Sequence, residues 1–129
     1  MIHRIATWST SNVSIELQRF KESYILRRTT GEQRRGIVFH KNRFFYVAKC
    51  VAVATLNQPN HLLPYRLPIA MVDGGHGTLT IEWGLDWYNQ ANALTIRGTV
   101  NTCVAVEQKD ARPFAHWLCK QYVVLEDRI

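Results

Sequence analysis

Basic side chains alternate with aromatic rings through the first part of the sequence, and this mixture could bind nucleic acid. Cations neutralise phosphates, and aromatic faces stack on unpaired bases. The pairs Arg27-Arg28 and Arg34-Arg35 flank a predicted turn, so they could meet at one end of a hairpin. The sequence therefore predicts a non-enzymatic module for single-stranded or structured RNA or DNA. Phosphate contacts are predicted at Arg27, Arg28, Arg34, Arg35, Lys41 and Arg43, and base stacking at exposed members of Phe39, Phe44, Phe45 and Tyr46.

The excess positive charge lies in the same part of the chain. The formal net charge is +6, and residues 1–49 hold ten Lys or Arg against three Glu, a balance of +7. Residues 50–129 hold six Lys or Arg against seven acids, a balance of −1. Such asymmetry favours a polyanion or an acidic protein surface as the partner of one face. The competing interpretation places the rings in the core and the arginines on edge strands, where charge opposes aggregation.

A glycine-rich segment, Asp73-Gly74-Gly75-His76-Gly77, places an acid and an imidazole next to backbone that could cradle an anion. Together with Glu82 it suggests a metal-dependent hydrolase, in which carboxylates hold the metal. Such sites often carry an acid-x-Lys triplet, but Glu82 is followed by Trp83 and Gly84. Three glycines between two extended runs are typical of a hairpin turn with positive φ angles. We therefore favour the turn, and the hydrolase is the third functional hypothesis.

Metal and thiol chemistry have little support in the sequence. His116 and Cys119 lie three residues apart on a predicted helix, but no CxxC or HxxxH pair completes a metal site. Cys50, Cys103 and Cys119 are odd in number and widely spaced, which indicates buried free thiols in a reducing compartment. We therefore expect no metal and no cofactor.

Trp87 and Tyr88 form an aromatic pair in a polar connection, where exposed rings would make a protein-interaction site. This pair, or the basic face, supports the second functional hypothesis. It is a protein that inhibits or adapts another protein, such as a virus or mobile element could encode. Its partner would present an acidic surface, and exposed edge strands would also permit a homodimer.

Residues 44–55 are rich in Val, Phe and Tyr, which favours a strand. With strands over 24–29 and 36–40 it would form a meander. Residues 12–22 show both helical spacing and period-2 alternation, and we favour a helix there. Residues 3–8 are expected to form a short edge strand.

Three prolines within residues 57–68 predict an irregular segment. Beyond it, strands are predicted over 69–72, 78–83, 94–100 and 102–107, with a longer connection over 84–93. Apolar residues at helical spacing predict a last helix over 110–125, with Asp110 as N-cap and Pro113 in the first turn. We detect no internal repeat.

These elements predict an α+β fold. It would contain an antiparallel sheet of five to seven strands, as a meander or partly open barrel, with the C-terminal helix packed on one face. A length of 129 residues suits a single globular domain. No apolar run approaches the roughly 18–20 residues of a membrane helix, and the N-terminus lacks a signal-peptide core. We therefore expect a cytoplasmic protein without a membrane partner.

Overall fold

The computed structural model describes residues 1–29, 35–86, 90–98 and 102–126. Its element order is four strands and a helix, followed by four strands and a second helix. The first unit contains β1 (His3–Ser9), β2 (Ser14–Phe20), β3 (Ser23–Arg28), β4 (Arg35–His40), the 3-10 turn η1 (Lys41–Arg43) and α1 (Phe44–Leu56). The second unit contains β5 (Leu67–Asp73), β6 (Thr78–Asp86), β7 (Ala91–Arg97), β8 (Cys103–Glu107) and α2 (Gln108–Glu126).

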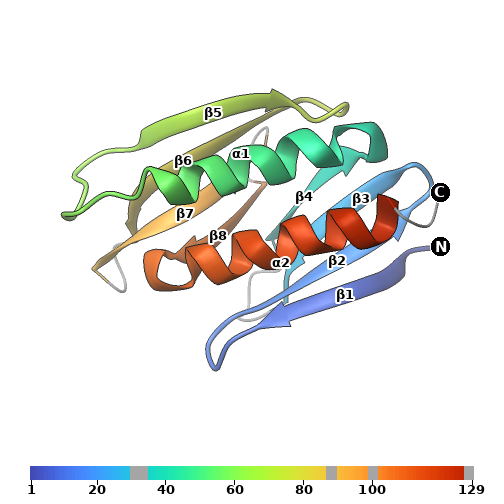
Figure 1. The fold of residues 1–129 in the computed structure, drawn as a ribbon, viewed down its shortest axis with the longest axis horizontal. Helices are drawn as coiled ribbons and strands as arrows, with labels where there is room; N and C mark the ends of the chain where they lie inside the picture. Colours follow the sequence, from blue (N-terminus) through green and yellow to red (C-terminus); the bar gives the residue numbers. More distant parts are fainter. Residues whose placement is uncertain (30–34, 87–89, 99–101, 127–129) are drawn as a thin grey trace.

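Each unit forms its own antiparallel sheet, in the orders β1-β2-β3-β4 and β5-β6-β7-β8. Both helices lie on the same side of the two sheets and run antiparallel to one another (Figure 1). The hydrophobic core between helices and sheets contains buried side chains from both units. The α+β class and the packing of the C-terminal helix on a sheet are therefore confirmed. The described chain has eight strands in two sheets, however, where five to seven in one sheet were predicted.

The first hairpins of the two units have the same register. Ala6 pairs with Leu17 in the first unit, and Ala70 pairs with Ile81 in the second, so both positions recur after 64 residues. Each first strand also has a register shift immediately before the alanine of that pair. The shared irregularity matters because a bulge is a local feature of one strand pair, and two independent folds would seldom place it identically.

The helices repeat one another as well. The first four buried side chains of α1 are Phe44, Val47, Ala48 and Val51. The buried side chains of α2 are Ala111, Phe114, Ala115 and Leu118, and each follows its α1 counterpart by 67 residues. The chain thus contains an internal structural repeat, although no repeat was detected in the sequence. The repeat conserves which positions are buried rather than which amino acids occupy them.

The strand predicted over residues 44–55 is wrong, because this segment is the helix α1. Its Val, Phe and Tyr residues favour strands, and it exposes Phe45 and Tyr46, so no polar face marks it as an amphipathic helix. Tertiary packing overrides that preference. The thiol of Cys119 on α2 reaches the Ala48 carbonyl at 3.7 Å, and the Trp83 indole of the second sheet donates to the Ala54 carbonyl at 3.1 Å.

The helix predicted over residues 12–22 is also wrong, because this segment contains the strand β2. Ile15 and Leu17 are fully buried in the core, while Glu16 and Gln18 lie on the opposite face of the sheet. The period-2 alternation was therefore the correct signal. The long connection over 84–93 is wrong too, since β6 continues to Asp86 and β7 begins at Ala91.

The last helix and the glycine-rich turn are confirmed. The helix α2 begins at Gln108, two residues before the predicted N-cap Asp110, so Pro113 lies in its second turn. The proline-rich segment is irregular up to the start of β5 at Leu67. Among the described residues, neither helix is long and apolar enough to span a membrane.

Candidate nucleic-acid interface

Three turns of the chain meet at the end of the molecule where α1 begins and α2 ends (Figure 1). They are the β2–β3 hairpin, η1 and the β5–β6 turn. The Lys41 amide donates to the Glu22 carbonyl and the His40 amide donates to the Gly74 carbonyl, each at 2.8 Å. Gly75 has a φ of +84°, and a Cβ there would lie 2.7 Å from the Cβ of His40, so this close approach requires glycine.

This end of the molecule carries cations and exposed rings from four elements. We call it the basic end surface. It is defined by the cations Arg19, Lys21, Lys41, Arg43 and Lys49 and by the rings of Phe20, Phe45 and Tyr46.

Two of these cations are held by carboxylates. Lys41 Nζ lies 2.5 Å from Glu22 Oε2, and Arg43 lies 3.6 Å from the Asp73 carboxylate. The hydrogen bond from Lys41, together with its charge, holds the pKa of the Glu22 carboxyl below its usual value. Both pairs are largely exposed, so each contributes little to folding stability. They add side-chain contacts to the backbone hydrogen bonds that join the three turns.

The other three cations lie over aromatic rings. Arg19 is 4.8 Å from the Tyr24 ring centroid, Lys21 is 5.3 Å from that of Phe20, and Lys49 is 6.0 Å from that of Phe45. None of the three forms a salt bridge with another described residue. Cations positioned in this way retain their charge for an anionic ligand.

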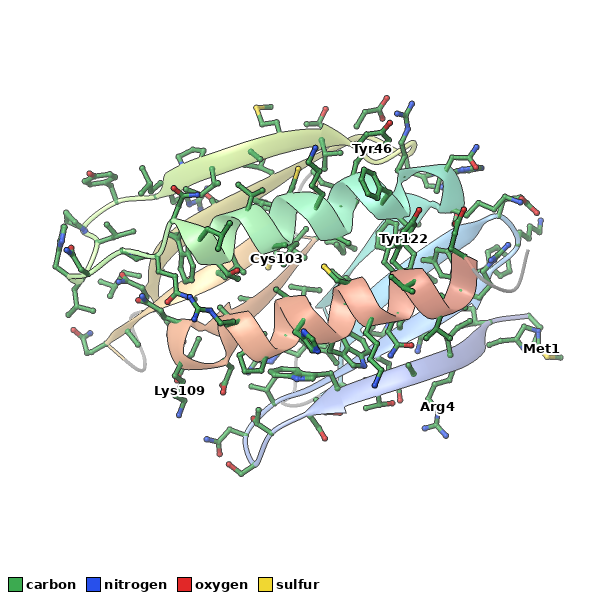
Figure 2. All side chains as sticks on the ribbon, in the orientation of Figure 1. Met1, Arg4, Tyr46, Cys103, Lys109 and Tyr122 are labelled. Carbon is green, nitrogen blue, oxygen red and sulfur yellow. The ribbon has the colours of Figure 1, made fainter. Side chains whose placement is uncertain are left out.

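A cleft of about 670 Å³ opens between the two helices at this end. Its walls include Tyr24, Phe44, Phe45 and Tyr122. The ring centroids of Phe45 on α1 and Tyr122 on α2 are 5.6 Å apart. Figure 2 shows Tyr46 and Tyr122 on neighbouring helices at this end of the molecule. Arg19 and Lys41 also line the cleft.

The second unit has no equivalent of this surface at the corresponding positions. Trp83 stands where the first unit has Arg19, and it is fully buried. Gln108 stands 67 residues after Lys41 and donates to the Pro59 carbonyl at 2.7 Å, which fixes the proline-rich segment across that end. The repeat is therefore asymmetric, because Arg19 and Lys41 of the first unit correspond to the buried Trp83 and to Gln108 of the second.

Arg27 and Arg28, two of the arginines predicted to cluster, are not brought together on one face. Arg27 and Arg28 lie at the opposite end of β3 from the basic end surface, and their alternation puts them on opposite faces of the sheet. A guanidinium nitrogen of Arg28 donates to the Ala105 carbonyl at 3.3 Å. Arg35 pairs with Arg28 through the backbone of β4, and Arg34 lies outside the described residues.

The predicted stacking residues divide by burial. Phe39 is 0% exposed and Phe44 is 2% exposed, so both rings belong to the core and cannot stack on a base. Phe45 and Tyr46, at 46% and 48%, have free ring surface on the first turn of α1. Lys41 and Arg43 do lie beside them. The predicted stacking residues whose rings are exposed therefore lie on a helix rather than on the predicted strand.

Sequence reasoning left Lys49 out of its set of basic residues, and it left Arg19, Lys21 and Phe20 out of the predicted site. Had a helix been predicted over residues 44–55, Lys49 would have been placed one turn after Phe45. Lys21 has a positive φ of 53° in a tight hairpin, which projects it beyond the sheet, and no sequence signal for that conformation is present.

The predicted hydrolase residues are not assembled into one site. Asp73 faces Arg43 at one end of β5, whereas Glu82 lies in the middle of β6 and accepts a hydrogen bond of 2.6 Å from Arg97. His76 Nε2 instead lies 2.6 Å from the Ser23 hydroxyl. No group of three or more His, Cys, Asp or Glu within the described residues could hold a metal ion.

The remaining predicted sites have mixed outcomes. Trp87 and Tyr88 lie outside the described residues. His116 is exposed, whereas Cys119 packs against α1. Burial raises the pKa of both the Cys119 and the Cys50 thiols.

A comparison of the chain with protein-family models and with curated proteins finds no match.

Proposed function

We propose that this protein binds single-stranded nucleic acid through the basic end surface. The observation that carries the proposal is a set of three cations, Arg19, Lys21 and Lys49, at one end of the molecule. They form no salt bridge within the described residues, and each lies over an aromatic ring. Phosphates would contact these cations, and unpaired bases would stack on the exposed rings. A duplex would offer its phosphates but would withhold its base faces.

The test compares charge reversals of equal size on the basic end surface and on the exposed side of α2. The double variant Lys21→Glu and Lys49→Glu removes two unpaired cations from the basic end surface. The control is Arg112→Glu combined with Lys120→Glu on α2, two exposed cations that form no salt bridge within the described residues. Both double variants change the net charge equally, so a general charge effect would appear in both.

Binding would be measured by fluorescence anisotropy with labelled single-stranded oligonucleotides across a salt series. We expect the Lys21/Lys49 variant to lose about 10-fold or more in affinity at low salt and to show a shallower salt slope. The α2 control should lose much less. Equal losses in both variants would assign the binding to overall charge, and that outcome refutes a defined interface.

A second candidate function rests on the exposed side of α1. This helix has one charged residue, Lys49, in 13 residues, and it exposes Phe45, Tyr46, Val53 and Leu56. A helix that is apolar on all sides is usually covered, and an exposed apolar stripe marks a protein-interaction surface. Here Val53→Asp would abolish binding to a protein partner and leave oligonucleotide affinity unchanged. Loss of oligonucleotide binding in Val53→Asp, with the fold intact, would argue against separate surfaces.

A further inference from the structure

A second hollow lies on the face of the β5–β8 sheet that is turned away from the helices. Side chains alternate along β6. Because Ile81 and Trp83 point into the core, Glu82 and Gly84 lie on the opposite face of the sheet. A groove of about 440 Å³ opens there, within the range of small-ligand sites. Pro64, Tyr65 and Arg66 line one side of it.

The floor of this groove consists of small side chains. Gly84 pairs with Ala93, and Thr95 pairs with Ala105, so four adjacent positions on three strands carry short side chains. If Gly84 carried a Cβ, the nearest atom to it would belong to the Arg66 side chain, at 3.9 Å. Short side chains leave room above them for a planar ring, and the Tyr65 ring stands exposed at the rim.

A carboxylate lies within this groove. Glu82 is only 4% exposed, and its Oε1 accepts a hydrogen bond of 2.6 Å from Arg97 Nε. The pair fixes the carboxylate, because Arg97 is held on the neighbouring strand and faces the same groove. An ionised carboxylate only accepts hydrogen bonds, so it selects a ligand edge that donates them.

We propose that this groove binds a guanine base. Guanine presents two adjacent donors, N1–H and the 2-amino group, which match an acceptor-only carboxylate, whereas adenine and cytosine each offer a single amino group beside an acceptor. Thymine and uracil offer one ring N–H between two carbonyl oxygens. The ring would lie on the floor formed by Gly84, Ala93 and Ala105, with Glu82 accepting from its Watson–Crick edge.

The groove is within reach of a strand held at the basic end surface, and this part of the inference rests on the proposed function. Residues Asp73 to Gly77 form the turn at that end, and Glu82 lies four residues along β6 from Thr78, about 13 Å at the usual rise. A strand crossing the uncovered face of the sheets would supply the base, and a free guanine nucleotide would satisfy the same chemistry.

The experiment measures base preference separately from overall affinity. The probes are labelled oligothymidylates of about 12 nucleotides, with and without three guanines near the centre. We expect guanine to raise the affinity of the wild-type protein by about 10-fold, since a bidentate contact of this kind discriminates by roughly 1–3 kcal/mol. Unlabelled guanosine monophosphate, added as a competitor and titrated directly, reports binding of the base outside a strand.

Two variants test the groove. Glu82→Gln should remove the guanine preference and leave the affinity for plain oligothymidylate unchanged. Ala105→Ile, which fills the floor and leaves Glu82 and Arg97 themselves unchanged, should do the same. Thermal unfolding of each variant shows whether the fold is retained, and Ala105→Ile keeps the test valid if Glu82→Gln is unstable.

The outcomes separate the two proposals. A wild-type protein that binds all oligonucleotides equally, or folded variants that keep the guanine preference, would overturn the guanine groove and leave the basic end surface standing. If no oligonucleotide binds, the proposed function fails. In that case, the groove would still be supported if the wild-type protein bound guanosine monophosphate and both variants did not. If the wild-type protein did not bind guanosine monophosphate, the groove would be overturned as well.

Discussion

Replacing Glu22 with Gln should strengthen binding to single-stranded nucleic acid. The Glu22 carboxylate is the partner of Lys41, and its lowered pKa keeps it charged throughout the neutral range. The substitution removes one negative charge from the basic end surface and frees Lys41 for a phosphate. The hairpin itself should survive, because the Lys41 amide still donates to the backbone carbonyl of residue 22.

The size of the effect follows from the number of unpaired cations. If Arg19, Lys21 and Lys49 each neutralise one phosphate, the slope of log affinity against log salt is about −2 for a single strand. Freeing Lys41 adds a fourth contact and makes the slope about −3. Between 50 and 200 mM salt, that difference makes the Glu22→Gln variant lose about 2- to 3-fold more affinity than the wild type. Its advantage is therefore greatest at low salt.

Fluorescence anisotropy at five or so salt concentrations would measure both slopes. The matched control is Glu107→Gln, which removes the same charge and breaks the 3.5 Å pair with Lys109 at the opposite end of the molecule. Figure 2 shows Lys109 at the start of α2, far from Tyr46 along the helices. Unchanged or weaker binding by Glu22→Gln, or an equal gain in Glu107→Gln, would refute the reasoning. Lowering the pH should imitate Glu22→Gln only below the usual carboxyl range, because the pKa of Glu22 is depressed.

Three further predictions concern the fold. Trp83→Phe removes the hydrogen bond to the Ala54 carbonyl and should lower the free energy of unfolding by about 1 kcal/mol, measured by urea denaturation. Gly75→Ala should cost about 1–3 kcal/mol in the same assay, because its φ is +84° and the added Cβ meets His40; a stability equal to wild type would contradict the required close approach. The Cys119 thiol, whose pKa is raised by burial, should react with a disulfide reagent at pH 8 more slowly than it does in the unfolded protein.

The sequence predicted the second half of the fold better than the first, for a physical reason. The strand β6 and the helix α2 each carry apolar residues mainly on one side, so their periods of two and 3.6 residues are visible in the sequence. The helix α1 is apolar on the core side and also on much of the exposed side, so its period is hidden. Its strand-forming composition then gave the wrong prediction.

The predicted grouping of the arginines differs from the structure for a related reason. The predicted arginines were grouped by their proximity in the sequence around a turn, but adjacent residues on a strand point to opposite faces. Arg27 and Arg28 are separated in that way. Lys41 and Arg43 were predicted to contact phosphates, and this stays a prediction. What places them beside Phe45 and Tyr46 is the helix that the composition concealed. The internal repeat is not visible in the sequence because equivalent positions carry different amino acids, as Arg19 in one unit and Trp83 in the other illustrate.

The asymmetry of the repeat also sets the stoichiometry and direction of any bound strand. Two identical chains related by a two-fold axis would present every feature twice, and a strand could lie across them in either direction with equal energy. Covalent linkage of the two units lets one end change without the other, as Arg19 and Trp83 illustrate. One protein molecule should therefore hold one strand, with a single preferred 5′ to 3′ orientation.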